Sequence, residues 1–103
     1  MRRALVNAIV RSPSRALLNV NIQRKTETRQ TVAVAGTVEA SAVNLMGQLQ
    51  TLLIREIREG DAIYYVAETP VTNSESLIFT VEVTPQGETD ALTVRFRKQF
   101  FVD

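Results

Sequence analysis

The segment "SLIFTVEVT", residues 76–84, alternates apolar and polar side chains more cleanly than any other part of this chain. Leu77, Phe79, Val81 and Val83 are apolar, and Thr80 and Glu82 lie between them. Because successive side chains of a strand point to opposite faces, this pattern predicts a strand with one buried face. A buried face needs a second layer to cover it. We therefore predict that Phe79 and Val81 are buried, together with Phe96 of a later strand.

The same alternation recurs along most of the chain. The further predicted strands are "RALLNVNIQ" (15–23), "QTVAVAGTVEA" (30–40), "LQTLLIREIRE" (49–59), "AIYYVAE" (62–68) and "ALTVRFRKQFFVD" (91–103). Gly36 marks a bulge or a close backbone approach within the second of these. About six short, half-buried strands favour an all-β fold, a single antiparallel sandwich or barrel, over a parallel α/β sheet.

The connections between these strands carry turn signals. Glu59-Gly60-Asp61 predicts a hairpin, and "SAVNLMGQ" (41–48) predicts a turn or one helical loop. Thr84-Pro85-Gln86-Gly87 predicts a type I turn, with proline second and glycine fourth. In the last strand, alternation would turn Lys98 inward, so we expect a bulge at Lys98-Gln99 that resets the phase.

The amino-terminal segment "MRRALVNAIVRS" breaks the period of two. We predict a short helix or turn over residues 3–10, with Leu5, Val6 and Ile9 facing inward and Ser12-Pro13-Ser14 ending it. The domain division is then an N-terminal segment, 1–14, and a β-sandwich domain, 15–103. The apolar run is too short to cross a bilayer, and no small-residue cleavage site follows it, so neither membrane insertion nor a signal peptide is predicted.

Composition removes several classes of chemistry. The 103 residues contain no cysteine and no histidine. Disulfides, thiolate metal sites, thiol catalysis and histidine-based triads are therefore excluded. The net charge of +1 gives no global attraction to nucleic acid or to an anionic membrane. The acidic residues around Gly60 suit a turn. We predict no catalytic residue, cofactor or metal, and no enzyme activity.

Tyr64 and Tyr65 raise the question of a ligand-stacking platform. They are neighbours within a predicted strand, so their side chains point to opposite faces and cannot form one platform. We expect one to lie in the core and the other on the outer face, which fits the preference of aromatic residues for strands. The alternation does not decide which is which.

The segment "RFRKQFF", residues 95–101, is the other candidate site. Arg95 and Arg97 share a face, and Phe101 would join them if the bulge shifts the phase. A basic face with aromatic side chains is how some β domains bind single-stranded nucleic acid. Glu82 and Glu68 are expected as cross-strand partners of these arginines, which favours a solvated face instead. The weak partner-binding set is Arg95, Arg97 and Tyr65.

The segments "SRALLNVNI", "NLMGQLQTLLIREIREGDAIYYVAETPV", "ESLIFTVEV" and "VRFRKQFFVD" resemble a family of uncharacterised exported proteins of Gram-negative bacteria, domain of unknown function 4426. The resemblance implies a periplasmic, immunoglobulin-like β-sandwich with no established activity, cofactor or catalytic residue. Members ordinarily carry a signal peptide and a further stretch, including a strand, before the segment that matches "NAIVRSPSRALLNV". By this resemblance the chain is expected to lack the family's amino-terminal part.

The sequence therefore predicts a non-catalytic binding or structural module of the bacterial cell envelope. A basic-faced domain that binds single-stranded nucleic acid is the alternative, although nucleic acid is the less favoured partner. A protein partner or self-association is expected. If a strand is missing, "RALLNVNIQ" becomes an exposed edge strand that could form a homodimer, and Leu18→Lys should then disrupt it. The opposing interpretation is that residues 1–10 fold back over this edge.

Overall fold

The computed structural model describes residues 2–101, and these form nine strands and no helix. The strands are β1 (Arg2–Ser12), β2 (Arg15–Lys25), β3 (Thr31–Ala33), β4 (Gly36–Asn44), β5 (Leu49–Leu52), β6 (Arg55–Glu59), β7 (Ala62–Pro70), β8 (Ser76–Pro85) and β9 (Leu92–Gln99). The predicted last strand extended to Asp103, and residues 102–103 lie outside the described range. Within that range nothing helical could cross a membrane.

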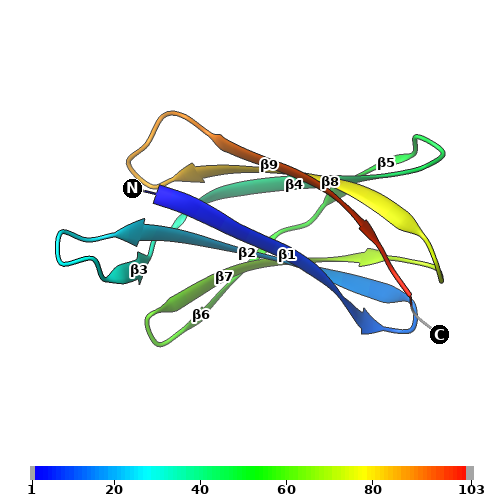
Figure 1. Cartoon of the computed structure of the whole chain (residues 1–103), viewed down its shortest axis with the longest axis horizontal. Coiled ribbons are helices and arrows are strands. Elements are labelled where there is room, and N and C mark those ends of the chain that lie inside the picture. The colour runs from blue at the N-terminus through cyan, green and yellow to red at the C-terminus, as the bar shows by residue number, and fades with distance from the viewer. Residues whose placement is uncertain (1, 102–103) are drawn as a thin grey trace.

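The strands form two antiparallel sheets that face each other in two layers (Figure 1). The five-stranded sheet has the order β1-β2-β7-β6, with β3 also paired to β2. The four-stranded sheet has the order β5-β4-β8-β9. The prediction of an all-β antiparallel sandwich is therefore confirmed. The expected strand number of about six is too low.

Two of the additional strands arise where the chain passes from one sheet to the other. The predicted strand 30–40 is divided at Val34–Ala35, so that β3 pairs in one sheet and β4 in the other. The predicted strand 49–59 is divided in the same way at Leu53–Ile54, between β5 and β6. An extended chain keeps its alternation through such a crossing, so the pattern of side chains does not reveal it.

The third additional strand is β1, and it corrects the prediction of an amino-terminal helix or turn. β1 pairs with β2 from Arg2 opposite Arg24 to Ser12 opposite Arg15, with a register shift between Val10 and Ser12. Val6 faces the core as expected, but Leu5 and Ile9 are 44% and 49% exposed. Apolar residues on both faces of β1 imitate a helical period. The segment 1–14 is therefore no separate unit in its described part.

The position of β1 also corrects the expected edge strand. β2 lies between β1 and β7, so "RALLNVNIQ" is an interior strand of its sheet. The opposing interpretation, that the amino-terminal residues cover it, holds for the described part. Leu18 is fully buried, so Leu18→Lys would disrupt the core and does not test an interface.

The core lies between the two sheets and is richest on their central strands. Leu18, Val20 and Ile22 of β2 face Phe79, Val81 and Val83 of β8, and all six are at most 1% exposed. The ring of Phe79 stacks on Phe96 at 5.0 Å between centroids and meets the edge of Phe100 at 6.1 Å. Phe79 and Val81 are buried as predicted, and Phe96 is partly buried.

Two local predictions are wrong. The β8–β9 register is continuous through Lys98 and Gln99, so there is no bulge. Lys98 is exposed because it lies near the end of β9, and Phe100, two residues later, is 1% exposed. The turn after β8 runs from Pro85 to Glu88, whose N–H donates to Pro85 O at 2.9 Å. Gly87 has φ 85° and takes the third position, one place earlier than predicted.

Candidate binding face of the four-stranded sheet

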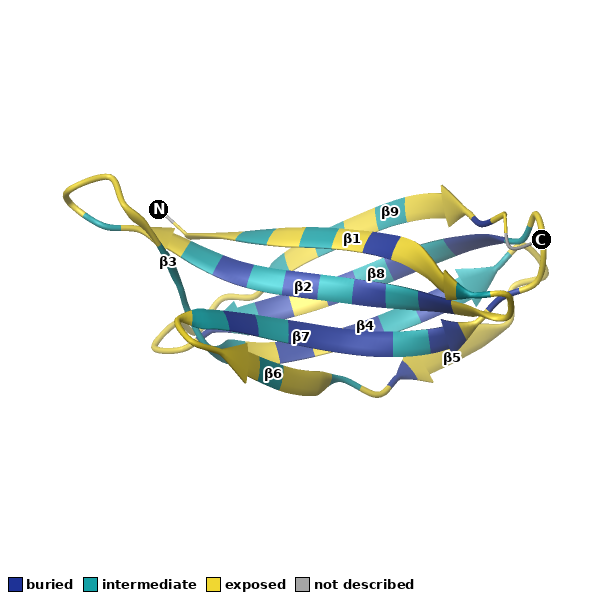
Figure 2. Cartoon of the chain, turned by 90° about the horizontal axis from the view of Figure 1, so that it is seen from below, coloured by how far each residue is buried: buried dark blue, intermediate teal, exposed yellow. Residues whose placement is uncertain are grey.

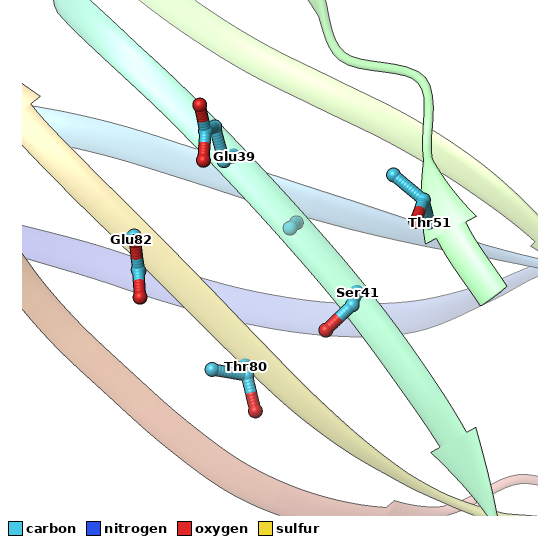
Figure 3. A pocket seen from close by; sticks show the side chains of 6 residues that line it. Glu39, Ser41, Thr51, Thr80 and Glu82 are labelled. Carbon is cyan, nitrogen blue, oxygen red and sulfur yellow. The ribbon is translucent and has the colours of Figure 1, made fainter. Parts of the chain in front are cut away.

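The outer face of the four-stranded sheet carries a shallow, polar depression (Figure 3). Strands β4, β5 and β8 supply its lining residues, Glu39, Ala40, Ser41, Thr51, Thr80 and Glu82. The strand register places Ser41 opposite both Thr80 and Thr51, which forms a row of hydroxyl groups across three strands. Such a row offers both donors and acceptors of hydrogen bonds to a partner.

Two carboxylates lie directly opposite each other beside this row. Glu39 of β4 and Glu82 of β8 are register partners, and both are exposed. Like charges in this arrangement destabilise a sheet. Neither carboxylate forms an ion pair with any residue in the range 2–101. The same part of the chain has no group of three or more acidic residues that could hold a metal ion. The pair therefore remains available for hydrogen bonds from a partner.

Arg95 and Arg97 lie on this face too, on the neighbouring strand β9. Both are exposed, and the register places them opposite Thr80 and Ile78. Neither has an ion-pair partner among the described residues. Glu82 is opposite Thr93 instead. Glu68 belongs to the other sheet, where it binds Arg11 at 3.0 Å. The predicted pairing of these arginines with Glu82 and Glu68 is therefore wrong for the described part of the chain.

The third residue of the predicted set, Tyr65, is elsewhere. Tyr65 is 4% exposed and faces the core from β7, in the five-stranded sheet. Tyr64 is half-buried on the outer face of the same strand. The prediction of opposite faces is confirmed, and the structure decides that Tyr65 is the inner one. Tyr65 does not share a surface with Arg95 and Arg97.

The hydroxyl of Tyr65 instead connects the two sheets. It accepts a hydrogen bond from the backbone N–H of Gly36 at 3.0 Å and donates one to Glu56 Oε1 at 2.8 Å. Burial raises the pKa of the Tyr65 hydroxyl. Hydrogen bonds from Arg58 and then from Tyr65 lower the pKa of the Glu56 carboxyl. This network has a structural role because the Tyr65 hydroxyl and both carboxylate oxygens of Glu56 have partners within the chain.

Gly36 is the point of close approach that its place in the sequence predicted. A Cβ atom there would lie 2.5 Å from Thr84 O and 2.8 Å from Ile22 Cδ1. No side chain fits without movement of the β8 backbone. The glycine therefore allows β4 to pass close to both sheets and brings its N–H to Tyr65.

Sequence reasoning missed the apolar hairpin between β4 and β5, which we define as Leu45, Met46 and Leu49. These side chains are 66%, 84% and 67% exposed. Asn44 fixes the loop, because its Oδ1 accepts hydrogen bonds from Met46 N at 3.0 Å and Gln48 N at 2.9 Å. Three large apolar residues around Gly47 were the available signal. The alternation-based reading predicts only a turn or one helical loop there.

These features define a small, all-β, two-sheet domain with a mixed polar and apolar outer face on its four-stranded sheet. Residues 3–103 match the family described as Domain of unknown function (DUF4426), and the chain belongs to this family. The predicted membership is therefore confirmed. Among curated proteins, none matches the sequence at a significant level.

The fold is similar to the crystal structure of a DUF4426 family protein from Pseudomonas aeruginosa PAO1. The two chains are 32% identical, and the TM-score is 0.82. The match covers 99% of this chain and 92% of that one. A bacterial relative therefore shares the two-sheet architecture over nearly the whole chain.

Proposed function

We propose that this chain is a non-catalytic, protein-binding module of the bacterial cell envelope. Its contact surface is the apolar hairpin together with the adjoining outer face of the four-stranded sheet. The observation that carries this proposal is the exposure of Leu45, Met46 and Leu49 side by side on one hairpin. Contiguous exposed apolar surface of this kind marks interaction sites in soluble domains.

The surroundings of the hairpin fit a protein interface. Val43 and Ile78 are half-buried neighbours on the outer face and extend the apolar surface onto β4 and β8. The hydroxyl row and the Glu39–Glu82 pair then supply a polar rim, which is the usual arrangement around an apolar interface centre. Because Asn44 already orders the loop, binding loses little conformational entropy there.

The strand order supports an immunoglobulin-like class for the sandwich. In such domains strands A, B, E and D form one sheet, and C, F and G form the other, with C′ added beside C in some members. If β1, β2, β7 and β6 are taken as A, B, E and D, the strand order of the five-stranded sheet matches the order of the ABED sheet. The second sheet, β5-β4-β8-β9, then corresponds to C′-C-F-G. The chain has no cysteine, so it lacks the disulfide of antibody domains.

The proposed envelope location, the periplasm, rests on what the family resemblance implies. Cell fractionation with the full-length gene under its own start tests it. The protein is expected in the periplasmic fraction together with a periplasmic marker enzyme. Recovery with a cytoplasmic marker would contradict the proposed location and leave the binding surface to be tested separately.

Binding of single-stranded nucleic acid stays the alternative function, and specific observations favour it. Arg95 and Arg97 have no ion pair in the described part of the chain, and Phe101 is 65% exposed. Glu82 on the neighbouring strand repels phosphate. Titration of a fluorescent oligonucleotide at low and high salt tests this function, because phosphate contacts weaken steeply as salt rises. Binding that Arg95→Ala/Arg97→Ala abolishes would favour the alternative.

The protein-binding proposal is tested by cross-linking in cells followed by purification of the tagged chain. The wild type and the variant Leu45→Ser/Met46→Ser/Leu49→Ser are compared with Leu53→Ser. Leu53 is the matched control because it is 83% exposed and lies outside the hairpin. A partner retained by wild type and by the control, but lost with the triple variant, supports the proposal. A partner that all three retain would contradict the assigned surface.

A further inference from the structure

β1 differs from the other three edges of the two sheets. β6 consists mostly of alternating arginine and glutamate, β5 has only 4 residues, and β9 carries three cations. The middle of β1, Ala4–Val10, has no charged residue and no proline, and β1 lies at the margin of its sheet (Figure 2). Native proteins usually protect edges with charge, proline or shortness. β1 lacks this protection along its middle.

The outward backbone groups of β1 pair with no other strand of the described residues. β1 pairs with β2 on one side, and no backbone hydrogen bond joins it to another strand within residues 2–101. It approaches β9 of the other sheet without such a bond. Alternate N–H and C=O groups of an edge strand point away from its neighbour. β1 can therefore accept one more strand in its own sheet.

The sequence of β1 is nearly palindromic about Asn7. On the outer face, the order is Arg3, Leu5, Asn7, Ile9, Arg11, and it reads the same by chemical type in both directions. Between these residues, Ala4 corresponds to Val10 and Val6 to Ala8. An interface about a two-fold axis needs such self-complementarity, because each residue i meets j while j meets i.

We propose that two copies of this chain pair antiparallel through β1, with a two-fold axis at Asn7. Their five-stranded sheets then join into one continuous sheet. Leu5 of each copy lies opposite Ile9 of the other, which covers two side chains that are 44% and 49% exposed in the single chain. The two Asn7 side chains meet on the axis, where their amides can hydrogen-bond each other. This interface is separate from the apolar hairpin and does not depend on the proposed function.

One feature of this pairing is unfavourable and provides a test of it. The symmetric register brings Arg3 of each copy near Arg11 of the other, at the point where β1 has a register shift between Val10 and Ser12. Like charges that face each other across two strands destabilise a sheet. Glu68 neutralises part of this charge, since it binds Arg11 at 3.0 Å. Added salt screens the remaining repulsion, so the dimer should tighten as salt rises. Arg3→Glu replaces both symmetry-related Arg3–Arg11 repulsions with attractions. It should lower the dissociation constant of the dimer at low salt by about tenfold.

Single cysteines test the register, because the natural chain has none. Opposed residues in an antiparallel pair have Cα atoms about 4.5–5.5 Å apart, within disulfide reach. Asn7→Cys should cross-link to itself under mild oxidation at low micromolar concentration. Leu5→Cys alone and Ile9→Cys alone should not cross-link, since the two symmetry-related cysteines of such a dimer lie about 13 Å apart. A mixture of the two variants should cross-link, because Leu5 lies opposite Ile9. Equal cross-linking of all three alone would contradict the register.

Paired charges test the association itself. Leu5→Lys/Ile9→Lys places like charges opposite each other, whereas Leu5→Glu/Ile9→Lys places opposite charges there. Light scattering over a dilution series should show a dimer for wild type and for the second variant. The dimer of the first variant should dissociate at concentrations at least about tenfold higher than the wild-type dimer does. Circular dichroism melts establish that both variants fold. A wild type that stays monomeric at high concentration, or that binds only an unrelated extended peptide, would overturn the proposal.

Discussion

β8 and β1 are strands of similar length with opposite relations to their surroundings. β8 lies between β4 and β9, and its inward residues Leu77, Phe79, Val81 and Val83 are at most 5% exposed. β1 lies at a sheet edge, and of its inward residues only Ala8 is fully buried. Its outer face carries Leu5 and Ile9 in solvent. Alternation is therefore informative only where one face meets the core and the other meets water.

The two strands also divide stability and interaction between them. β8 contributes Phe79, a fully buried aromatic side chain, and its stacking with Phe96. β1 contributes small inward residues and leaves its larger ones on the surface. Substitution in β8 should therefore change the free energy of unfolding. Substitution on the outer face of β1 should change association and leave folding nearly unaltered.

The largest expected effect is that of Phe79→Ala. Loss of a fully buried ring and of its two aromatic contacts should lower the free energy of unfolding by about 3–5 kcal/mol. The matched substitution in β1, Leu5→Ala, should change it by less than about 0.5 kcal/mol. Denaturant titrations at low protein concentration measure both. Equal losses would remove the distinction between the central strand and the edge strand.

Gly36→Ala tests whether a substitution in β4, the other central strand of the four-stranded sheet, also lowers the free energy of unfolding. The new Cβ would meet Thr84 O and Ile22 Cδ1, so the β8 backbone must move. We expect a loss of about 1–3 kcal/mol in unfolding free energy. Thr37→Ala, at the next and exposed position, is the control. A thermal melt unchanged from wild type would show that β4 has room to shift.

Tyr65→Phe measures the hydrogen bonds that connect the sheets. The substitution keeps the ring and leaves the Gly36 N–H without its partner, so a loss of about 1–2 kcal/mol is expected. The folded-state pKa of Tyr65 is raised, so its contribution is present below pH 10.0 and is lost as pH rises through the folded pKa. The variant should therefore lose less stability than wild type above pH 10.0. An unaltered alkaline profile would contradict this assignment.

The smallest effect concerns Glu56, whose side chain is 41% exposed. Its folded-state pKa is lowered from 4.5, so its contribution is present above pH 4.5 and is lost as pH falls through the lowered value. Glu56→Gln should therefore flatten the acid side of the stability profile. Glu59→Gln, on the same strand, is the control. If the control flattened the profile as much, the Arg58 and Tyr65 hydrogen bonds would not be the cause.

Much of the fold could be predicted because alternation reports directly on burial. Leu18, Val20, Phe79 and Val81 were placed correctly in the core, and Gly36 was placed at a close approach. The candidate surface was only partly predictable. Arg95 and Arg97 were found on their face, but the apolar hairpin was passed over. Its residues became unusual only once the structure showed that nothing in the described range covers them.

The sequence by itself determined the all-β class, the phase of most strands and the opposite faces of Tyr64 and Tyr65, because these depend on local geometry. The tertiary structure alone decided where the chain passes between sheets, which tyrosine is inside, and which strand forms the edge. Those outcomes depend on contacts between segments far apart in the chain. The side chains of an extended chain alternate in the same way in either sheet, so the alternation does not reveal which strands are its neighbours.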